Sequence, residues 1–425
     1  MHRDKVFGVE IGGAAPGGVA AALELPATRM EIFDALQMAR VKDVRDCKVD
    51  LLEVGKARDY LHNPIRGSCI GENPDLGELN FLARCLAAQN RNESMCFEGM
   101  VRMERERAGV PIPLSRLINI SYSLDNCVVA PGVRTDAQLG DFLYKNEMLS
   151  EDTHDMARMK KLTSRYAEQY MSILGSVHRA ETGGVFAAAG YVENLGGEIK
   201  EVFTPGQTPP LDAGVGIPQD SDCAMLLQVS KPGGAVPVSD EFTDVIALPT
   251  DSGALLRAVG QVGAERPERC EYAVVDCVVP RLALPVNDAM GQDCDSGFTL
   301  ANELAGQLRR LSADGALLVY KAMLDRVEPD ALTLLEALAL SRQTGGFKLR
   351  GEVASPEAYA REEIQKSDLP AKEALLNSGS LYSYGEALMA ERGEAMTAYG
   401  MLVPKVGPEL GQAPTEREES GMVMG

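Results

Sequence analysis

Pairs of carboxylates are the residues of this sequence whose type best suits acid–base chemistry. Asp50 and Glu53 are three positions apart, and Glu362 and Glu363 are adjacent. General acid–base catalysis needs such groups to lie within hydrogen-bond reach of a substrate and of a partner group. The sequence brings neither a partner nor a pocket to these pairs, so we expect no catalytic residue and a protein that is not an enzyme.

Cysteine and histidine residues give no sign of metal or redox chemistry. The nine cysteines are never spaced as C-x-x-C, and an odd number of them cannot all pair within one chain. The histidines His2, His62, His154 and His178 lie far apart, without an H-E-x-x-H pattern. We therefore expect reduced thiols in a cytoplasmic protein, with no metal and no other cofactor.

A glycine-rich run at 12–18 follows a strand-like segment, as a dinucleotide-binding loop would. The run lacks the G-x-G-x-x-G spacing, and the next helical stretch begins only after Pro26. We expect a hairpin loop here rather than a phosphate-binding loop.

Acidic residues outnumber basic ones and are unevenly distributed. The chain has 62 Asp and Glu against 42 Lys and Arg, a net charge of −20. Residues 1–200 contain 28 acidic and 24 basic side chains, whereas 201–425 contain 34 and 18. Direct binding to DNA or RNA is disfavoured, because phosphate contact needs a basic surface.

The length of 425 residues favours two or more compact units. No apolar run reaches the roughly 18–20 residues that span a bilayer. The charged start Met1–Lys5 is unlike a signal peptide. We expect a cytoplasmic protein that does not associate with a membrane.

Apolar periodicity predicts an α+β fold in which small sheets flank a helical middle section. Strands are expected at 6–11, 49–54, 186–192, 225–229, 271–279 and 397–403, and helices at 31–36, 78–86, 254–259, 303–311 and 357–366. Capping signals are Asp75 with Glu78, Thr135 with Gln138, and Ser355 before Pro356. Asp330 is expected to cap a further helix over 331–340.

Landmarks of the first part of the chain return in the same order in the second part. The matched segments are 6–28 with 225–250, 78–86 with 303–311, 97–101 with 320–324, and 183–192 with 393–402. The last match has an offset of 210, which also pairs Gly175 with Gly385. The shared order predicts a tandem duplication.

The predicted duplication gives a first copy at 1–203 and a second copy at 222–415. The segment 204–221 between them is rich in Pro and Gly and is expected to be a linker. The polar tail 416–425 is expected to be disordered. The second copy is the more divergent and the more acidic of the two.

Several soft motifs carry a family resemblance through their order and spacing. They are 25–28 (LPAT), 78–83, 117–125, 131–133, 139–143, 183–186 and 190–192, with 384–386 and 398–400 in the second copy. Together they resemble the ArdA-like antirestriction proteins of Gram-positive mobile genetic elements. The resemblance implies an elongated, acidic protein that imitates bent B-form DNA in the groove of type I restriction-modification enzymes. It also implies dimerisation, here as a homodimer or as an intramolecular pseudo-dimer of the two copies.

A DNA decoy must present carboxylates at a spacing comparable to that of phosphates, about one charge per 1.7 Å of B-DNA axis. Helices can do so because residues i, i+3 and i+4 share a face. The candidates in the first copy are Asp136, Asp141, Glu147, Glu151 and Asp152. Those in the second copy are Asp288, Asp293, Asp295, Asp325, Glu328, Asp330, Glu352, Glu357, Glu362, Glu363 and Asp368. Each acid alone is typical of a solvated helix, so the hypothesis rests on their sum.

We therefore expect a DNA-mimic inhibitor whose partner is a DNA-binding defence enzyme, with type I restriction-modification enzymes as the default target. Direct contact with nucleic acid is not expected. The alternative is an interaction inhibitor or scaffold of the same fold with another target, such as another nuclease or a CRISPR effector. Salt separates the two, because a phosphate mimic loses affinity steeply with ionic strength and an apolar interface does not.

Overall fold

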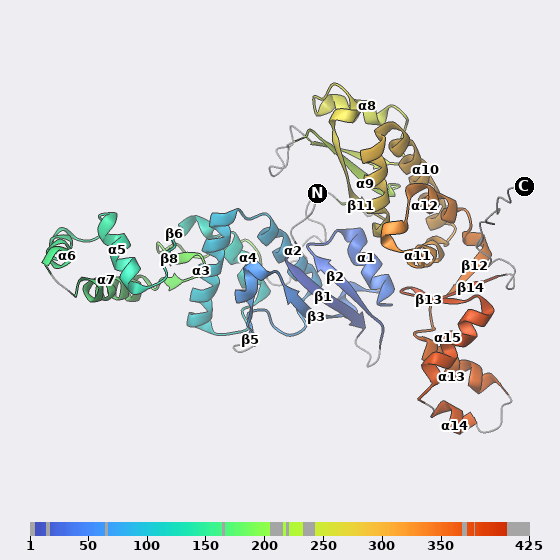
Figure 1. Ribbon diagram of the computed structural model, residues 1–425, viewed down its shortest axis with the longest axis horizontal. Coiled ribbons are helices and arrows are strands. Elements are labelled where there is room, and N and C mark those ends of the chain that lie inside the picture. The colour runs from blue at the N-terminus through green and yellow to red at the C-terminus, as the bar shows by residue number, and fades with distance from the viewer. Residues whose placement is uncertain are drawn as a thin grey trace, which may run out of the picture. The chain divides into compact units, whose positions relative to one another are not determined.

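The structure is a computed structural model, and it has the predicted α+β fold (Figure 1). It describes residues 5–13, 18–63, 67–163, 166–204, 216–217, 221–232, 243–367, 372–377 and 379–405. The chain divides into a first unit of residues 1–11, 22–28 and 43–214 and a second unit of residues 12–21, 29–42 and 215–425. None of the helices in the described ranges combines the length and the apolar character of a membrane span.

A three-stranded sheet with the order β2-β1-β3 opens the chain. Its strands are β1 (Phe7–Gly13), β2 (Ala20–Leu25) and β3 (Cys47–Val54). Because β1 and β2 are neighbours in the sheet, the glycine-rich run joins adjacent strands, as the hairpin prediction requires. Residues 14–17 of that run lie outside the described part of the chain.

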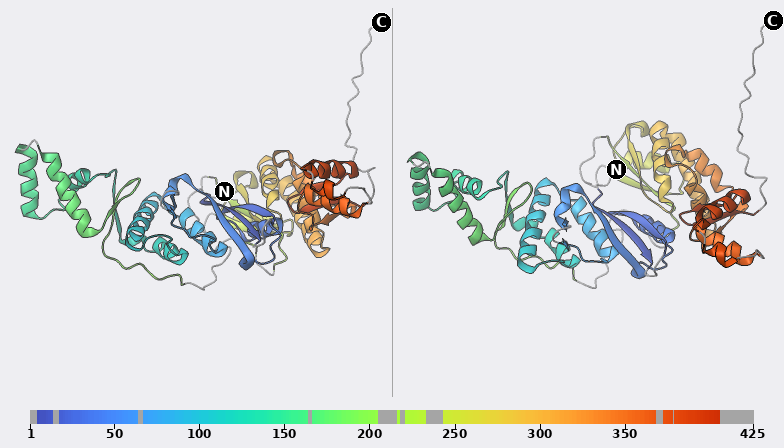
Figure 2. Two further views of the ribbon diagram at one scale, coloured as in Figure 1. Left: turned by 90° about the horizontal axis from the view of Figure 1, so that it is seen from below. Right: turned by 60° about the horizontal axis from the view of Figure 1, so that its bottom comes forward.

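Helices and a second small sheet make up the rest of the first unit. After the short strands β4 (His62–Asn63) and β5 (Gly67–Ser68) come α2 (Leu76–Ala87), α3 (Arg91–Ala108) and α4 (Leu114–Ser121). The sheet β6-β8-β7 consists of β6 (Cys127–Pro131), β7 (Val185–Phe186) and β8 (Gly190–Asn194). Between β6 and β7 lie α5 (Asp136–Lys145), α6 (Glu151–Thr163) and α7 (Ala167–Thr182), the green helices that lie together in both views of Figure 2.

The second unit opens with an antiparallel sheet of order β10-β9-β11, against which α8 and α9 pack. Its elements are β9 (Met225–Ser230), β10 (Thr243–Leu248), α8 (Ala254–Gln261), β11 (Glu271–Cys277), α9 (Ala283–Gln292), α10 (Cys294–Ala313), α11 (Leu317–Asp325) and α12 (Leu334–Ser341). A sheet of order β12-β14-β13 follows, formed by β12 (Phe347–Arg350), β13 (Ala395–Thr397) and β14 (Gly400–Pro404). Between β12 and β13 lie α13 (Pro356–Lys366), α14 (Lys372–Leu376) and α15 (Leu381–Arg392). Helix α1 (Arg29–Met38) also belongs to this unit and contacts β11.

The same side-chain clasp follows the Leu-Pro segment in both units. In the first unit the Asn80 amide accepts from the Ala27 backbone N–H at 2.8 Å and donates to the Ala27 carbonyl at 3.0 Å. In the second unit Asn302 makes the same two bonds with Thr250, at 2.7 and 2.9 Å. Each helix that carries the asparagine, α2 or α10, is thereby fixed to the chain after the second strand.

A glycine allows two helices to cross closely in each unit. A Cβ at Gly175 of α7 would lie 1.9 Å from the carbonyl oxygen of Asp136, the first residue of α5. A Cβ at Gly385 of α15 would lie 1.9 Å from the carbonyl oxygen of Pro356, the first residue of α13. These two glycines are the ones that the predicted repeat pairs at an offset of 210.

The predicted caps are mostly confirmed. Asp75, Thr135 and Ser355 accept hydrogen bonds from the backbone N–H groups of Glu78, Gln138 and Ala358, and so cap α2, α5 and α13. The prediction for Asp330 is wrong. That residue lies in the short 3-10 helix η7 (Pro329–Ala331), and Thr333 caps α12 in a reciprocal capping box with Glu336.

Candidate functional site

Exposed carboxylates from adjoining elements of the second unit form the candidate site. Asp288 is on α9, Asp293 and Asp295 are at the start of α10, and Glu328 and Asp330 flank Pro329 of η7. The helices α9, α10 and α12 pack on one another, and η7 leads into α12. All five side chains belong to exposed residues, and none of the ion pairs between described residues involves them. We call these five residues the acidic set of the second unit.

One member of this set also has a structural role. The Asp293 carboxylate caps α10 by accepting from the backbone N–H groups of Asp295 at 3.2 Å and Ser296 at 3.3 Å. The Ser296 hydroxyl donates to it at 2.7 Å. The hydrogen bonds from Ser296 lower the pKa of Asp293, so this charge persists below the usual range for aspartate.

Asp325, another predicted acid, has a structural role. One carboxylate oxygen accepts from the backbone N–H of Ala398, in the turn between β13 and β14, at 2.8 Å, and the other pairs with Arg281 at 3.4 Å. Glu98 of the first unit has the matching role, because it accepts from the Ala188 N–H between β7 and β8 at 2.9 Å and pairs with Arg102. These carboxylates hold a hairpin turn and have basic partners.

Ion pairs also compensate Glu352, in the turn after β12, and the described acids of α13. Glu352 pairs with Arg350 at 2.8 Å and Glu357 with Arg361 at 2.8 Å. The remaining pairs are Glu362 with Arg350 and Lys366, and Glu363 with Arg392 and Lys366. Hydrogen bonds from their basic partners lower the pKa of both Glu352 and Glu362. Asp368 lies outside the described residues.

The acids predicted in the first unit fall into two groups. Asp136 pairs with Arg179 at 2.9 Å, and Asp141 pairs with Lys145 at 2.6 Å and with Lys161. Glu147, Glu151 and Asp152 are exposed residues for which the described part of the chain provides no ion pair. The structure therefore leaves three predicted acids of the first unit and five of the second uncompensated.

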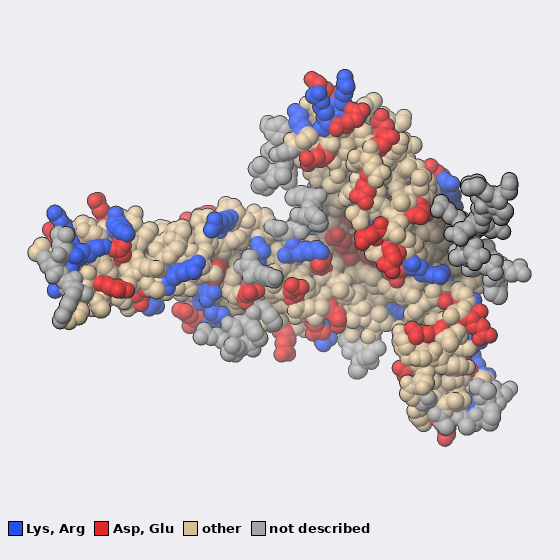
Figure 3. All heavy atoms as spheres, in the orientation of Figure 1, with Lys and Arg blue, Asp and Glu red and all other residues tan. Residues whose placement is uncertain are grey.

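The distribution of charge differs between the units on the face shown in Figure 3. Red side chains follow the region of α9 to α12 with sparse blue among them, whereas red and blue alternate over the first unit. The basic residues of α10 and α11 are partly committed elsewhere, since Arg309 pairs with Asp222 at 2.9 Å and Lys321 with Asp34 at 2.6 Å. Arg310 and Arg326 are exposed in the same region and take part in none of the ion pairs between described residues, so the acidic set has some basic residues near it in the chain.

The sequence analysis missed two exposed leucines, one on α9 and one on α12. Leu284 of α9 is 49% exposed and Leu335 of α12 is 63% exposed. Leu335 follows Leu334, which is buried. The two adjacent leucines at the start of a helix could have indicated in the sequence that one of them is exposed. Exposed leucines of this kind add apolar area to the surface of α9 and α12.

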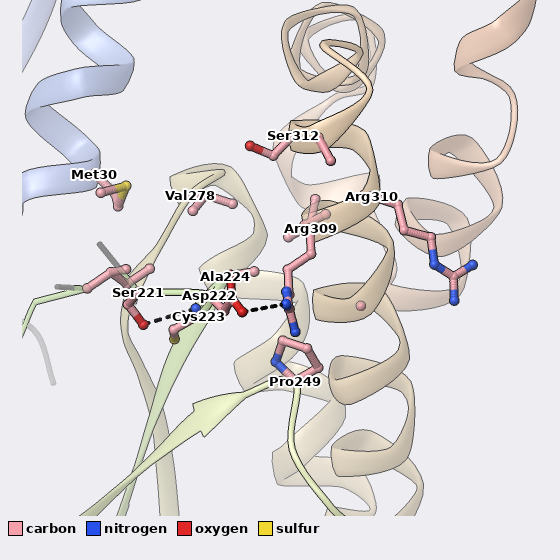
Figure 4. Close-up of a pocket in the computed structure, with 14 residues that line it drawn as sticks. Met30, Ser221, Asp222, Cys223, Ala224, Pro249, Val278, Arg309, Arg310 and Ser312 are labelled. Carbon is pink, nitrogen blue, oxygen red and sulfur yellow. Dashed lines mark hydrogen bonds and ion pairs between the residues drawn. The ribbon is translucent and has the colours of Figure 1, made fainter. Parts of the chain in front are cut away.

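A cavity of about 720 Å³ lies beside α10 in the second unit (Figure 4). Arg309 points toward Asp222 across it, and Arg310 is directed away from that pair. Burial raises the pKa of Cys223 in its lining, which makes that thiol a weak nucleophile. In the described part of the chain no three His, Cys, Asp or Glu side chains gather as a metal site requires. Because Arg309 and Asp222 pair with each other and Arg310 is directed away from them, the cavity is a weaker candidate than the acidic set.

Known proteins do not extend this description. No family model, curated protein or solved structure matches the chain. The resemblance to the ArdA-like family therefore stays a prediction, and the case for a function rests on the surface itself.

Proposed function

We propose that this chain is a DNA-mimic inhibitor that occupies the DNA-binding groove of a host defence enzyme, with type I restriction-modification enzymes as the first target to test. The observation that carries the proposal is the acidic set of the second unit. Asp288, Asp295, Glu328 and Asp330 present uncompensated carboxylates from elements that pack together. Such a surface can substitute for phosphates in a basic groove, because the groove binds by summed charge rather than by one contact.

The acids with structural partners contribute less to this proposal. A carboxylate already paired with arginine or lysine has little net field at a distance, as for Glu357 and Glu362. The functional charge is therefore smaller than the sixteen predicted residues suggested, and it lies mainly on α9, α10 and η7.

An interaction inhibitor or scaffold with another target, such as a CRISPR effector, is the second candidate. Leu284 and Leu335 favour it, because they place apolar area on α9, which carries Asp288, and on α12, which follows η7. Apolar contacts contribute roughly 25 cal/mol per Å² of buried area and respond little to salt.

Competition with DNA tests the proposal. The full-length chain is immobilised, and binding of a purified type I restriction-modification enzyme is measured with and without long duplex DNA, from low to moderate salt. A DNA mimic should be displaced by the duplex, and its affinity should fall steeply with salt. A complex that tolerates both DNA and salt unchanged would overturn the mimic and favour the apolar interface. No binding at all would remove this target.

A further inference from the structure

Cys96 and Cys127 lie against each other in the first unit, although 31 positions separate them in the chain. Cys96 is on α3, and Cys127 begins β6, which packs against α3. The Cys96 sulfur is 4.0 Å from the Cys127 carbonyl oxygen, and the Cys127 sulfur is 3.9 Å from the Cys96 carbonyl oxygen. Both thiols are free.

The surroundings give the two thiols different properties. The hydrogen bond from Cys127 lowers the pKa of Cys96 against the effects of burial and of the Glu93 carboxylate. The same bond, with burial and the negative charge of Glu193, raises the pKa of Cys127. Cys96 is only 2% exposed, whereas Cys127 is half-buried, so a reagent in solvent reaches Cys127 first.

Two other thiols of the first unit have different neighbours. The Cys69 sulfur contacts the Tyr60 carbonyl oxygen at 3.4 Å, and the Cys85 sulfur contacts the Tyr122 hydroxyl at 3.9 Å. Cys69 and Cys85 are therefore suitable controls for the Cys96–Cys127 pair.

We propose that Cys96 and Cys127 form a redox-active dithiol that a low-molecular-weight disulfide, such as glutathione disulfide, converts to an intramolecular disulfide. The raised pKa of Cys127 keeps its thiolate fraction small, so the first step is slow. In that step the Cys127 thiolate attacks one sulfur of the reagent, breaks its S–S bond, and forms a mixed disulfide while one glutathione thiolate leaves. The Cys96 thiolate then attacks the Cys127 sulfur and releases the second glutathione thiolate. The two thiol protons pass through solvent to these thiolates, so the protein is oxidised by two electrons and the reagent is reduced to two thiols.

The position of the pair determines what the disulfide would do. An S–S bond is about 2.05 Å long, so the two side chains must turn their sulfurs from the carbonyl oxygens toward each other. Helix α3 contacts β6, β7 and β8, and the bond would therefore tie it covalently to the sheet β6-β8-β7. A cross-link of this kind restricts the unfolded chain and raises stability.

Peptide mapping of the full-length protein tests this proposal. The reduced chain is incubated with glutathione disulfide, and digestion without reductant is followed by mass spectrometry. The expected product joins the peptides that contain Cys96 and Cys127 with the loss of two hydrogens. The melting temperature should rise by several degrees, and dithiothreitol should reverse both changes.

Variants identify the pair. Cys127→Ser should abolish the cross-link, whereas Cys69→Ser and Cys85→Ser should retain it. Circular dichroism verifies that each variant is folded, and the wild-type peptide map does not depend on any variant. Accumulation of a glutathione adduct on Cys127 without a cross-linked peptide would overturn the proposal.

Discussion

Lys321 donates to the Asp34 carboxylate at 2.6 Å inside the second unit, where the two side chains are only 3% and 11% exposed. Gln37 accepts a second hydrogen bond from Lys321 at 2.8 Å, and the Tyr399 hydroxyl donates to Asp34 at 2.9 and 3.0 Å. Burial and the Asp34 charge raise the pKa of Tyr399, which keeps its hydroxyl protonated as a donor. The cluster joins α1 to α11 and to the turn before β14.

Removal of Lys321 should destabilise the second unit strongly. Lys321→Met leaves the Asp34 charge buried without its cation, and breaking a buried pair in this way costs about 3–5 kcal/mol. Urea unfolding followed by circular dichroism measures the loss, since the chain has no tryptophan for fluorescence. Adding Asp34→Asn should recover part of the stability, because it removes the uncompensated charge. Wild-type stability of Lys321→Met would contradict the role assigned to the pair.

The close helix crossings predict that replacing their glycines lowers the stability of the protein. Gly175→Ala and Gly385→Ala each place a methyl group 1.9 Å from a backbone carbonyl oxygen, so the helices must separate. Gly306 of α10 is the matched control, because a Cβ there meets nothing within 4 Å. Gly306→Ala should stabilise the protein by up to about 1 kcal/mol, from helix propensity alone. Equal melting temperatures for all three variants would show that the crossings do not need glycine.

Local patterns predicted much of this fold. Strand and helix positions follow from periodicity, and the caps at Asp75, Thr135 and Ser355 follow from short-range rules. The cap at Asp330 was wrong because Pro329 starts a separate 3-10 turn, and Thr333 with Glu336 makes the better capping box three residues later. Two overlapping capping signals cannot be ranked without the geometry of the chain.

The sequence alone could not identify side-chain partners that lie far apart in the chain. Lys321 and Asp34 are 287 positions apart, and the sequence around either residue does not indicate that the other is its partner. Asp325 resembles a surface acid in sequence, and only the fold brings the Ala398 N–H to it. Composition was sufficient to propose the acidic residues. It could not show which of them form ion pairs with basic residues. That the two units arose by duplication stays a prediction.

Glu104 predicts a dependence of stability on pH. Burial works to raise the pKa of this carboxyl, but hydrogen bonds from Arg116 and Arg107, at 3.2 and 2.7 Å, outweigh it and lower the pKa. A folded-state pKa below the unfolded value, about 4.3 for glutamate, stabilises the fold above that pH. This contribution is lost as pH falls through the folded-state pKa. Glu104→Gln should thus be less stable than wild type at pH 7, and the gap should narrow in acid; a gap that is constant from pH 7 to pH 3 would contradict the ion-pair account.

Charge reversal distinguishes the contributions of the two units to partner binding. Changing Asp288, Asp295 and Glu328 to lysine shifts the net charge of the second unit by +6, and changing Glu147, Glu151 and Asp152 to lysine shifts that of the first by the same amount. All six acids are exposed residues without an ion pair among the described residues. The second-unit set has one acid in the first turn of an α-helix and the first-unit set has two, so the melting temperature of each variant is measured as a control. Single surface charges are worth only about 0–1 kcal/mol, so one reversal should do little. Three together on adjoining elements should slow association with a type I restriction-modification enzyme by about tenfold or more at low salt, because steering follows summed charge. The first-unit set should have a smaller effect, since acidic and basic residues in that unit are nearly balanced in number.

Stopped-flow association rates measure the effect of both sets of substitutions. A larger loss from the first-unit set would transfer the binding surface to that unit, and equal losses would mean that neither unit alone directs the encounter.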